Sequence, residues 1–367
     1  MPAAPEIAVV GAGVVGLSAA FALRMRGVPV AVYETGTPGN GQSGGASRIF
    51  RHAHDDPRLV AAARTSRRLW RQWGERLGVE TVSSDGAVAI GEAVPHRLAT
   101  LHEAGGVPAR SLRPGELAEW LPILAAVEGP AMVDEAGGAI RTEQAIAALA
   151  AALGDAIVTD EVLALRPGDD GSVEVIAGGG RRRYAGALVC AGRGTAALAR
   201  PLGLSLPVAL AAHMRLTFRV HGVPPARLAC LQDSSGVFGE SGVYAAAVAG
   251  NREYAVGLAE SVPATPAGAL SDPEGLAALA ARTRAYVARA LPGLDPDPVG
   301  WRSCWTTELP WGPDGVAVWE AGGARFLVGH NLFKQAPGLG EALADMVAGA
   351  TPALDLRPGA ELGRRAG

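Results

Sequence analysis

A glycine-rich turn near the start of the sequence has the spacing that binds the pyrophosphate of a dinucleotide. Gly11, Gly13 and Gly16 form a GxGxxG pattern, and Glu34 closes the next apolar run. Such glycines allow a tight turn, close approach of backbone N–H groups to phosphate and close packing of helix on strand, while the acid accepts hydrogen bonds from ribose hydroxyls. Because an acid repels a 2′-phosphate, the pattern favours FAD or NAD over NADP.

Lysine occurs once in the sequence, at Lys334, among 33 lysine and arginine residues in total. A compositional drift toward arginine explains the rarity. Such a drift spares lysine where the two cations are not interchangeable, for example where a compact charge is needed. From composition alone, Lys334 is either such a position or a chance survivor on the surface.

The composition excludes several classes of function. Three cysteines with no CxxC pair exclude zinc ribbons, thioredoxin-like motifs and a disulfide framework, and no metal site is expected. A net charge of −3 provides no field for nucleic acid or an acidic membrane surface. The apolar run Ala145–Leu153 is shorter than the ~20 residues of a membrane span, and Glu6 stands where a secretory signal would be positive. We therefore expect a cytoplasmic, untargeted protein that binds neither nucleic acid nor membrane.

The turn lies between elements that would position it. Ile7–Val10 predicts a strand, Leu17–Arg26 a helix and Val28–Tyr33 a second strand. Further helices are predicted at Leu59–Leu77, Arg97–Glu103, Gly115–Trp120 and Thr142–Leu153, and strands at Ala156–Leu165, Ser172–Ile176 and Arg183–Cys190. The last strand runs into Ala191-Gly192, which indicates a return to the dinucleotide-binding sheet and hence a discontinuous domain.

From Leu206 to Thr307 the pattern becomes alternating and rich in strands. Strands are predicted at Val208–Val220, Val243–Val248, Tyr254–Leu258 and Val299–Thr306, a helix capped by Asp272 at Pro273–Leu291, and then a strand at Arg325–Val328 and a helix at Gly338–Ala348. The fold class expected is α/β, with two domains. Residues 1–80, 138–205 and 308–367 would form a Rossmann-like dinucleotide-binding domain, and 81–137 and 206–307 a separate antiparallel sheet domain.

Several motifs occur in the order seen in one flavoprotein family. They are the glycine turn with Glu34, the segment from Gly44 to His52 that reads GGASRIFRH, Cys304, and the GHNLFK loop of Gly329 to Lys334 followed by GLGE. With these, the sequence resembles the monomeric sarcosine oxidase and glycine oxidase-like branch of the D-amino-acid-oxidase family of FAD-dependent oxidoreductases. The resemblance spans nearly the whole chain.

The resemblance implies that Arg51 and Lys334 hold the carboxylate of a substrate. Guanidinium binds a carboxylate through two parallel hydrogen bonds, and ammonium adds a compact charge; this role would explain the single lysine. The alternative for Arg51 is a surface or phosphate-pairing arginine, a structural role that suits Arg48 better. The FAD-binding residues expected are Gly11, Gly13, Val14, Val15, Gly16, Glu34, Ser43, Arg48, Ala191, Gly192, Cys304, Gly329, Asn331, Leu332, Phe333 and Lys334.

Cys304 matches the position at which this family attaches FAD through an 8α-thioether. That bond needs a thiolate close to the methyl edge of the flavin. From the sequence alone, a cysteine beside Ser303 and Trp305 is also consistent with a small buried hydrophobe. The resemblance implies a covalent flavin; the residues leave both interpretations open.

The sequence departs from the sarcosine oxidase pattern in two places. The strand at Tyr254–Leu258 lacks the lysine that promotes reaction with oxygen in that pattern. The loop around His330 and the His213-Met214 pair also differ, which puts sarcosine itself in doubt. We assign neither histidine an acid–base role.

The resemblance implies oxidation of the C–N bond of a carboxylate-bearing amine. The expected substrate is a secondary amino acid, either an N-substituted glycine or a cyclic imino acid, giving an imine that hydrolyses while O₂ is reduced to H₂O₂. Alternatives are a primary-amine glycine or D-amino-acid oxidase, a dehydrogenase with another acceptor, and a non-catalytic dinucleotide-binding protein. The partners expected are a small amino acid and O₂, for a monomer or small homo-oligomer.

Overall fold

The glycine turn follows an inner strand of a six-stranded sheet. The computed structural model describes residues 6–265 and 267–364. The strands of this sheet, in spatial order, are β19 (Val316–Ala321), β20 (Ala324–Gly329), β12 (Gly186–Val189), β1 (Ile7–Val10), β2 (Val30–Glu34) and β8 (Ile157–Thr159). All neighbours pair in parallel except β19 and β20. Strands from distant parts of the sequence therefore meet beside the turn.

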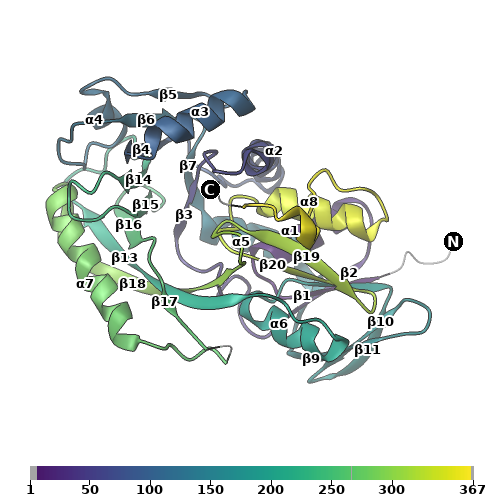
Figure 1. The fold of residues 1–367 in the computed structure, drawn as a ribbon. Coiled ribbons are helices and arrows are strands. Elements are labelled where there is room, and N and C mark those ends of the chain that lie inside the picture. The colour runs from purple at the N-terminus through teal and green to yellow at the C-terminus, as the bar shows by residue number, and fades with distance from the viewer. Residues whose placement is uncertain (1–5, 266, 365–367) are drawn as a thin grey trace.

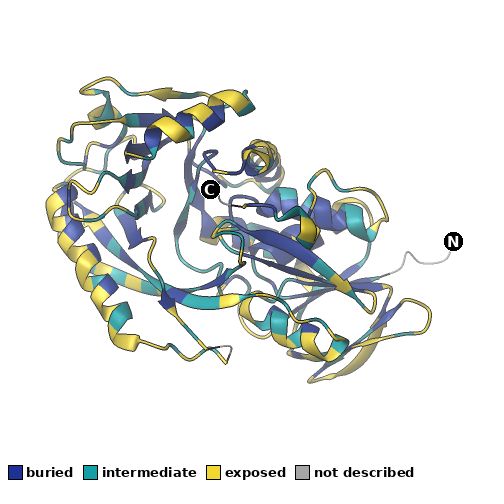
Figure 2. Ribbon diagram, in the orientation of Figure 1, coloured by how far each residue is buried: buried dark blue, intermediate teal, exposed yellow. Residues whose placement is uncertain are grey.

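Helices cover one face of this sheet, and a small sheet covers the other (Figure 1). The helices are α1 (Val14–Met25), α2 (Pro57–Leu77), α5 (Thr142–Leu153) and α8 (Ala336–Val347). The other face carries α6 (Thr195–Ala199) and the antiparallel strands β9 (Val162–Pro167), β10 (Val173–Ala177) and β11 (Gly180–Tyr184). Figure 2 shows the strands between these layers as buried, consistent with an apolar core on each face.

A nine-stranded sheet forms the second half of the molecule. It contains β4 (Ala87–Gly91), β5 (Ala109–Ser111), β6 (Ala131–Asp134), β13 (Ala209–Val220), β14 (Cys230–Ser234), β15 (Val243–Ala247), β16 (Glu253–Leu258), β17 (Val262–Pro263) and β18 (Leu294–Glu308). Its pairs are antiparallel except β4 with β14, which join the two stretches of chain that build the sheet. Helix α7 (Pro273–Ala290) lies along its outer side (Figure 1), and the peripheral helices are α3 (Val94–Ala104) and α4 (Glu116–Trp120).

A two-stranded ribbon joins the halves. It consists of β3 (Ser47–Phe50) and β7 (Gly138–Arg141). The Ser47 hydroxyl donates to the carbonyl of Ala246 in the nine-stranded sheet, over 3.2 Å. The short 3₁₀ turns are η1 (Gly154–Ala156), η2 (Gly192–Gly194), η3 (Arg200–Leu202) and η4 (Pro358–Ala360).

The predicted fold class, α/β with a Rossmann-like half and a second half built on a mainly antiparallel sheet, is confirmed. Two predicted strands were wrong in extent. Arg183–Cys190 is divided at Ala185 into β11 and β12, which belong to different sheets, and Ala156–Leu165 is divided into β8 and β9. The capping of α7 is as expected, because the Asp272 carboxylate accepts a hydrogen bond from the Gly275 N–H at 2.9 Å.

The predicted domain boundaries remain our proposal: one domain of residues 1–80, 138–205 and 308–367, and a second of residues 81–137 and 206–307. Residues 1–5 and 365–367 of the first domain lie outside the described residues. Among the described residues, no helix has the length and apolar character needed to cross a membrane.

Candidate functional site

A cavity of about 1450 Å³ lies where the two sheets face each other. Its lining comes from the glycine turn after β1, the end of β2, the β3 segment, strands β13, β15 and β18, and the loop after β20. The carboxyl ends of parallel strands are where open α/β sheets bind ligands. The cavity is therefore where the sequence motifs were expected to act.

The glycine turn forms one end of the cavity. Gly11 has φ +99°, and a Cβ there would lie 2.6 Å from the Cys190 carbonyl oxygen, so only glycine fits. Gly16 lies outside the cavity lining; its Cβ would lie 1.9 Å from the Gly11 carbonyl oxygen, which explains how closely α1 approaches the turn. Ser43, on the loop between β2 and β3, supports the turn, because its Oγ accepts a hydrogen bond from the Val14 N–H at 2.9 Å.

Glu34 faces the same end with both carboxylate oxygens held by backbone. Oε2 accepts from the Ala12 N–H at 2.9 Å, and Oε1 from the Gly36 N–H at 3.1 Å. The carboxylate is thus fixed beside the turn, as a ribose-binding acid would be. Of the expected FAD-binding residues, all but Gly16 line the cavity: Gly11, Gly13, Val14, Val15, Glu34, Ser43, Arg48, Ala191, Gly192, Cys304, Gly329, Asn331, Leu332, Phe333 and Lys334.

Cys304 lines the cavity next to a half-buried arginine, Arg48. It is on β18, and the Arg48 Nη2 lies 3.6 Å from its Sγ. Arg48 also donates to the carbonyl oxygens of Ser47, at 3.0 Å, and Gly44. Burial, with a further contribution from the like charge of Arg215, lowers the pKa of Arg48 to about 10. Within residues 6–265 and 267–364, neither Arg48 nor Arg215 forms an ion pair with a carboxylate. The part of the cavity around Cys304 therefore carries uncompensated positive charge.

Two histidines border the same region without contributing charge. His213 on β13 is paired with Cys304 across the strand ladder, and its ring lies 5.9 Å from that of His330. The Tyr244 hydroxyl lies 3.4 Å from the His213 Nδ1. Burial lowers the pKa of His213 to about 3 and that of His330 to about 4, so both rings are neutral at neutral pH.

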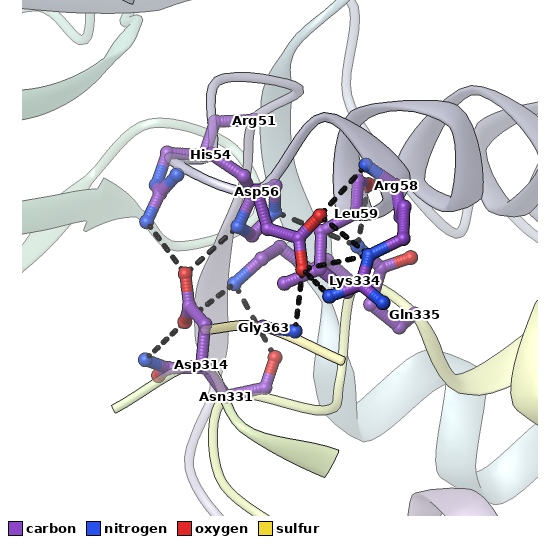
Figure 3. A network of polar contacts seen from close by, with 10 residues as sticks. All are labelled: Arg51, His54, Asp56, Arg58, Leu59, Asp314, Asn331, Lys334, Gln335 and Gly363. Atoms are coloured by element: carbon purple, nitrogen blue, oxygen red, sulfur yellow. Dashed lines mark hydrogen bonds and ion pairs between the residues drawn. The ribbon is translucent and has the colours of Figure 1, made fainter. Parts of the chain in front are cut away.

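The two cations expected to bind a substrate carboxylate converge on an acid of the chain itself (Figure 3). The Arg51 Nη2 lies 3.5 Å from the Asp314 Oδ2, and the Lys334 Nζ lies 3.8 Å from the Asp314 Oδ1. Asp314 is held by shorter bonds from His54 Nδ1, at 2.8 Å, and from the Asn331 side-chain amide, at 2.9 Å. The structure thus brings Arg51 and Lys334 together, with an internal carboxylate between them.

Burial and charge compete in this cluster. Burial raises the pKa of Asp314, but Lys334, His54 and Arg51 together hold it well below its ordinary value. Burial lowers the pKa of Lys334 to about 8, with Asp314 opposing the shift and Arg51 adding to it. Burial likewise lowers the pKa of His54 to about 3. His54 is therefore a neutral donor to a charged Asp314.

A scaffold of hydrogen bonds fixes the cluster to α2 and the C-terminal segment (Figure 3). Asp56 caps α2 by accepting from the Arg58 N–H at 2.9 Å and also accepts from the Gly363 N–H at 2.8 Å. The Gln335 side-chain amide donates to the Leu59 carbonyl at 3.3 Å and lies 3.5 Å from the His54 Nε2. These contacts position His54 and the loop that carries Lys334.

Sequence reasoning missed Asp314, His54, Arg215 and Tyr244. Asp314 stands in a Pro-Asp-Gly turn, which predicts a turn but no ligand. His54 follows Arg51 by three residues and could have been noticed as a polar residue in the same segment. The strand β16, where the oxygen-site lysine was sought, contributes none of the residues that line the cavity.

Comparison with known proteins gives one family and a common fold. The family model described as DAO, FAD dependent oxidoreductase, matches residues 6–346. No curated protein sequence matches the chain.

Three solved structures illustrate the similarity in fold. NikD, an unusual amino acid oxidase essential for nikkomycin biosynthesis, has 23% identity and a TM-score of 0.80, covering 97% of each chain. Glycine oxidase from Geobacillus kaustophilus has 24% identity and a TM-score of 0.79, covering 96% of this chain and 98% of its own. L-proline dehydrogenase from P. horikoshii has 18% identity and a TM-score of 0.80, covering 97% of this chain and 96% of its own.

Proposed function

Because the chain belongs to the DAO family of FAD-dependent oxidoreductases, we propose that it oxidises the C–N bond of a carboxylate-bearing amine. The substrate we favour is a secondary amino acid, an N-substituted glycine or a cyclic imino acid, converted to an imine that hydrolyses. The observation that supports this most is the convergence of Arg51 and Lys334, at 3.5 and 3.8 Å, on one carboxylate. A pair of cations that reaches one carboxylate in a cavity has the geometry to hold another.

The residues of this chain would bind and orient. Among the described residues, Asp314 is the only polar partner of the Arg51 guanidinium. Its remaining N–H groups would take the substrate carboxylate, with Lys334 adding charge from the loop after β20. The α carbon would then be directed toward the flavin, and FAD supplies the two-electron acceptor when bound. No strong side-chain base is required if the amine binds neutral, which agrees with the neutral His213 and His330.

The glycine turn would hold the pyrophosphate of FAD, and Glu34 its ribose. Gly11 and Gly13 line the cavity at the N-terminus of α1, where backbone N–H groups favour phosphate. Cys304 and Arg48 lie farther along the cavity. We propose that Cys304 carries the flavin covalently.

We propose O₂ as the electron acceptor, with H₂O₂ as product, for a monomer or small homo-oligomer. The charges of Arg48 and Arg215 in the cavity lining support reaction with oxygen, because positive charge stabilises the anions that form as oxygen is reduced. A dehydrogenase with a different acceptor is the second candidate, because β16 offers the cavity no cation.

The test is to mix the FAD-loaded protein with candidate substrates without oxygen and follow the loss of flavin absorbance. Secondary amino acids should bleach the flavin faster than primary glycine or D-amino acids, and their methyl esters should not bleach it. Admitting air should restore the colour and release peroxide in equal amount. If no amino acid bleaches the flavin, the proposed reaction is wrong; if bleaching occurs without peroxide, the acceptor is wrong.

A further inference from the structure

A third cation faces the substrate end of the cavity from the nine-stranded half. Arg97, on α3, is among the residues that line the cavity. Its Nη1 is buried and has no hydrogen-bond partner in the described part of the chain. A buried donor without an acceptor costs free energy, and a native structure that keeps one has a reason to do so. The position therefore suits a ligand that supplies the acceptor.

The acids near Arg97 do not neutralise it. Burial lowers the pKa of Arg97 to about 10, and the like charge of Arg51 adds to the shift, while Asp55 and Asp314 oppose it. Asp55 is exposed to water, and Asp314 is already held by His54, Asn331 and the cations around it. Arg97 still carries its charge at neutral pH.

Three cations from different elements line the same cavity: Lys334 on the loop after β20, Arg51 after β3 and Arg97 on α3. The like charge of Arg51 contributes to the lowered pKa of both Lys334 and Arg97. A ligand with one carboxylate at Arg51 and Lys334 would leave Arg97 available to a second acidic group.

We propose that Arg97 binds a second acidic group of the substrate, so that the enzyme acts on an N-substituted glycine or a cyclic imino acid that carries a second carboxylate. This inference rests on the proposed function, which places the first carboxylate at Arg51 and Lys334. A planar guanidinium suits a carboxylate, because it donates two parallel hydrogen bonds. Arg97 then selects the substrate from the nine-stranded half, while the glycine turn holds the cofactor from the other.

The test measures binding rather than turnover. The FAD-loaded protein is titrated with matched acids that differ by one carboxylate, acetate against malonate, propionate against succinate and butyrate against glutarate, and the flavin absorbance is followed. At least one dicarboxylate should bind about tenfold or more tightly than its partner, as expected for one charge-assisted hydrogen bond. Arg97→Gln should abolish this preference and leave monocarboxylate affinity unchanged.

Two variants serve as comparisons. Arg64→Gln removes an exposed arginine that contacts the Ala104 carbonyl at the end of α3, at 3.5 Å, outside the cavity; it should keep the preference. Arg97→Lys keeps the positive charge but lacks the planar guanidinium, so it should keep part of the preference for dicarboxylates. This variant tests the proposal if Arg97→Gln folds poorly.

The proposal is overturned if wild type shows no dicarboxylate preference, or if Arg97→Gln weakens both acids of each pair equally. Failure of the proposed function gives a different result: Arg51→Gln would then bind monocarboxylates as well as wild type does. The two failures are read from different variants and are therefore distinguishable.

Discussion

At the scale of single residues, Asp314 supplies a negative charge between Arg51 and Lys334, the two cations proposed to bind the substrate carboxylate. Burial alone favours a neutral Lys334, and Asp314 counteracts this by supplying a fixed negative charge 3.8 Å away. His54 and Asn331 hold that carboxylate at shorter distances than the cations do. Asp314 is thus positioned by neutral donors, which leaves capacity on Arg51 and Lys334 for a ligand.

Replacing Lys334 by Met should weaken substrate binding. The change keeps much of the side chain and removes a charge-assisted contact, at a cost of ~1.5–3 kcal/mol, or about tenfold to over a hundredfold in affinity. Titration of flavin absorbance with a substrate or a monocarboxylate measures the loss. The methyl ester of the substrate is the control: it should bind wild type poorly and lose little more in the variant. Equal weakening of acid and ester would contradict the role.

Affinity for a monocarboxylate without an amine should fall with rising pH because of the same lysine. The pKa of Lys334 is lowered to about 8, so the ammonium is present below pH 8 and is lost as the pH rises through that value. Binding should therefore be strongest below about pH 7 and weaken above about pH 9. Lys334→Arg, which stays charged, should flatten the profile measured by flavin titration. A wild-type profile without a step near pH 8 would show that Lys334 does not act through its charge.

Replacing Cys304 by Ser should release the flavin. If Cys304 forms the thioether, acid denaturation of wild type leaves the yellow colour with the precipitated protein, whereas Cys304→Ser leaves it in the supernatant. Cys230→Ser changes a buried cysteine outside the cavity lining and is the matched control. Release of the flavin from wild type would refute the bond without affecting the assignment of FAD.

At the scale of elements, the close approach of α1 and α8 is what positions the glycine turn. A Cβ at Gly340 would lie 2.7 Å from the Ser18 backbone, so the two helices touch there without an intervening side chain. Helix α1 begins at the turn that faces the cavity, and α8 follows the loop that carries Lys334. One helix contact therefore connects the part of the cavity at the glycine turn, proposed for the cofactor, to the part at Lys334, proposed for the substrate.

Gly340→Ala should separate these helices. Overpacking of this kind costs about 1–3 kcal/mol of folding free energy, and we expect a matching loss in urea unfolding together with weaker FAD retention. Gly359→Ala is the control, because nothing lies within 4 Å of a Cβ at that position. If both variants unfold alike, the helix contact is not as tight as described.

The elements that sequence could predict are those with a strong local pattern. The βαβ unit around Gly11 was predicted because its turn, helix and strand are contiguous, and α7 was predicted from its periodicity and Asp272 cap. Strand β4 was missed because a short apolar run in an alanine-rich sequence does not distinguish strand from helix, and β14 was missed because its five residues, CLQDS, show no strand pattern. Their pairing, which joins residues more than 140 positions apart, is set by tertiary contacts.

At the scale of the whole molecule, a buried histidine–acid pair helps to connect the two halves. Asp134 on β6 accepts from the His52 backbone N–H at 2.8 Å and lies 2.9 Å from the ring Nδ1. His52 immediately follows Arg51, so the pair fixes the segment that carries the cation. The candidate site could be predicted from the sequence only in part. Arg51 and Lys334 belong to sequence motifs, whereas Asp314 is brought next to them by the folding of distant segments.

Asp134→Ala should destabilise the whole chain. It leaves two buried donors of His52 without an acceptor, and each costs about 1–3 kcal/mol. Urea unfolding followed by flavin fluorescence should show the loss. Glu135→Ala is the neighbouring control, since Glu135 pairs with Arg110 at the surface and exposed pairs contribute at most about 1 kcal/mol. Equal effects of the two variants would contradict this role for Asp134.

The interleaved path of the chain has a consequence for its synthesis. Strand β20 and helix α8 come from the last fifty residues, yet β20 pairs with β12, and α8 covers α1. While the polypeptide is still emerging from the ribosome, the side of α1 that packs on α8 is not yet covered, and β4 awaits β14. Chains of this size with such distant pairings fold slowly and expose aggregation-prone surface meanwhile. Yield in a heterologous host should therefore depend on chaperone supply and growth temperature more than on the stability of the finished protein.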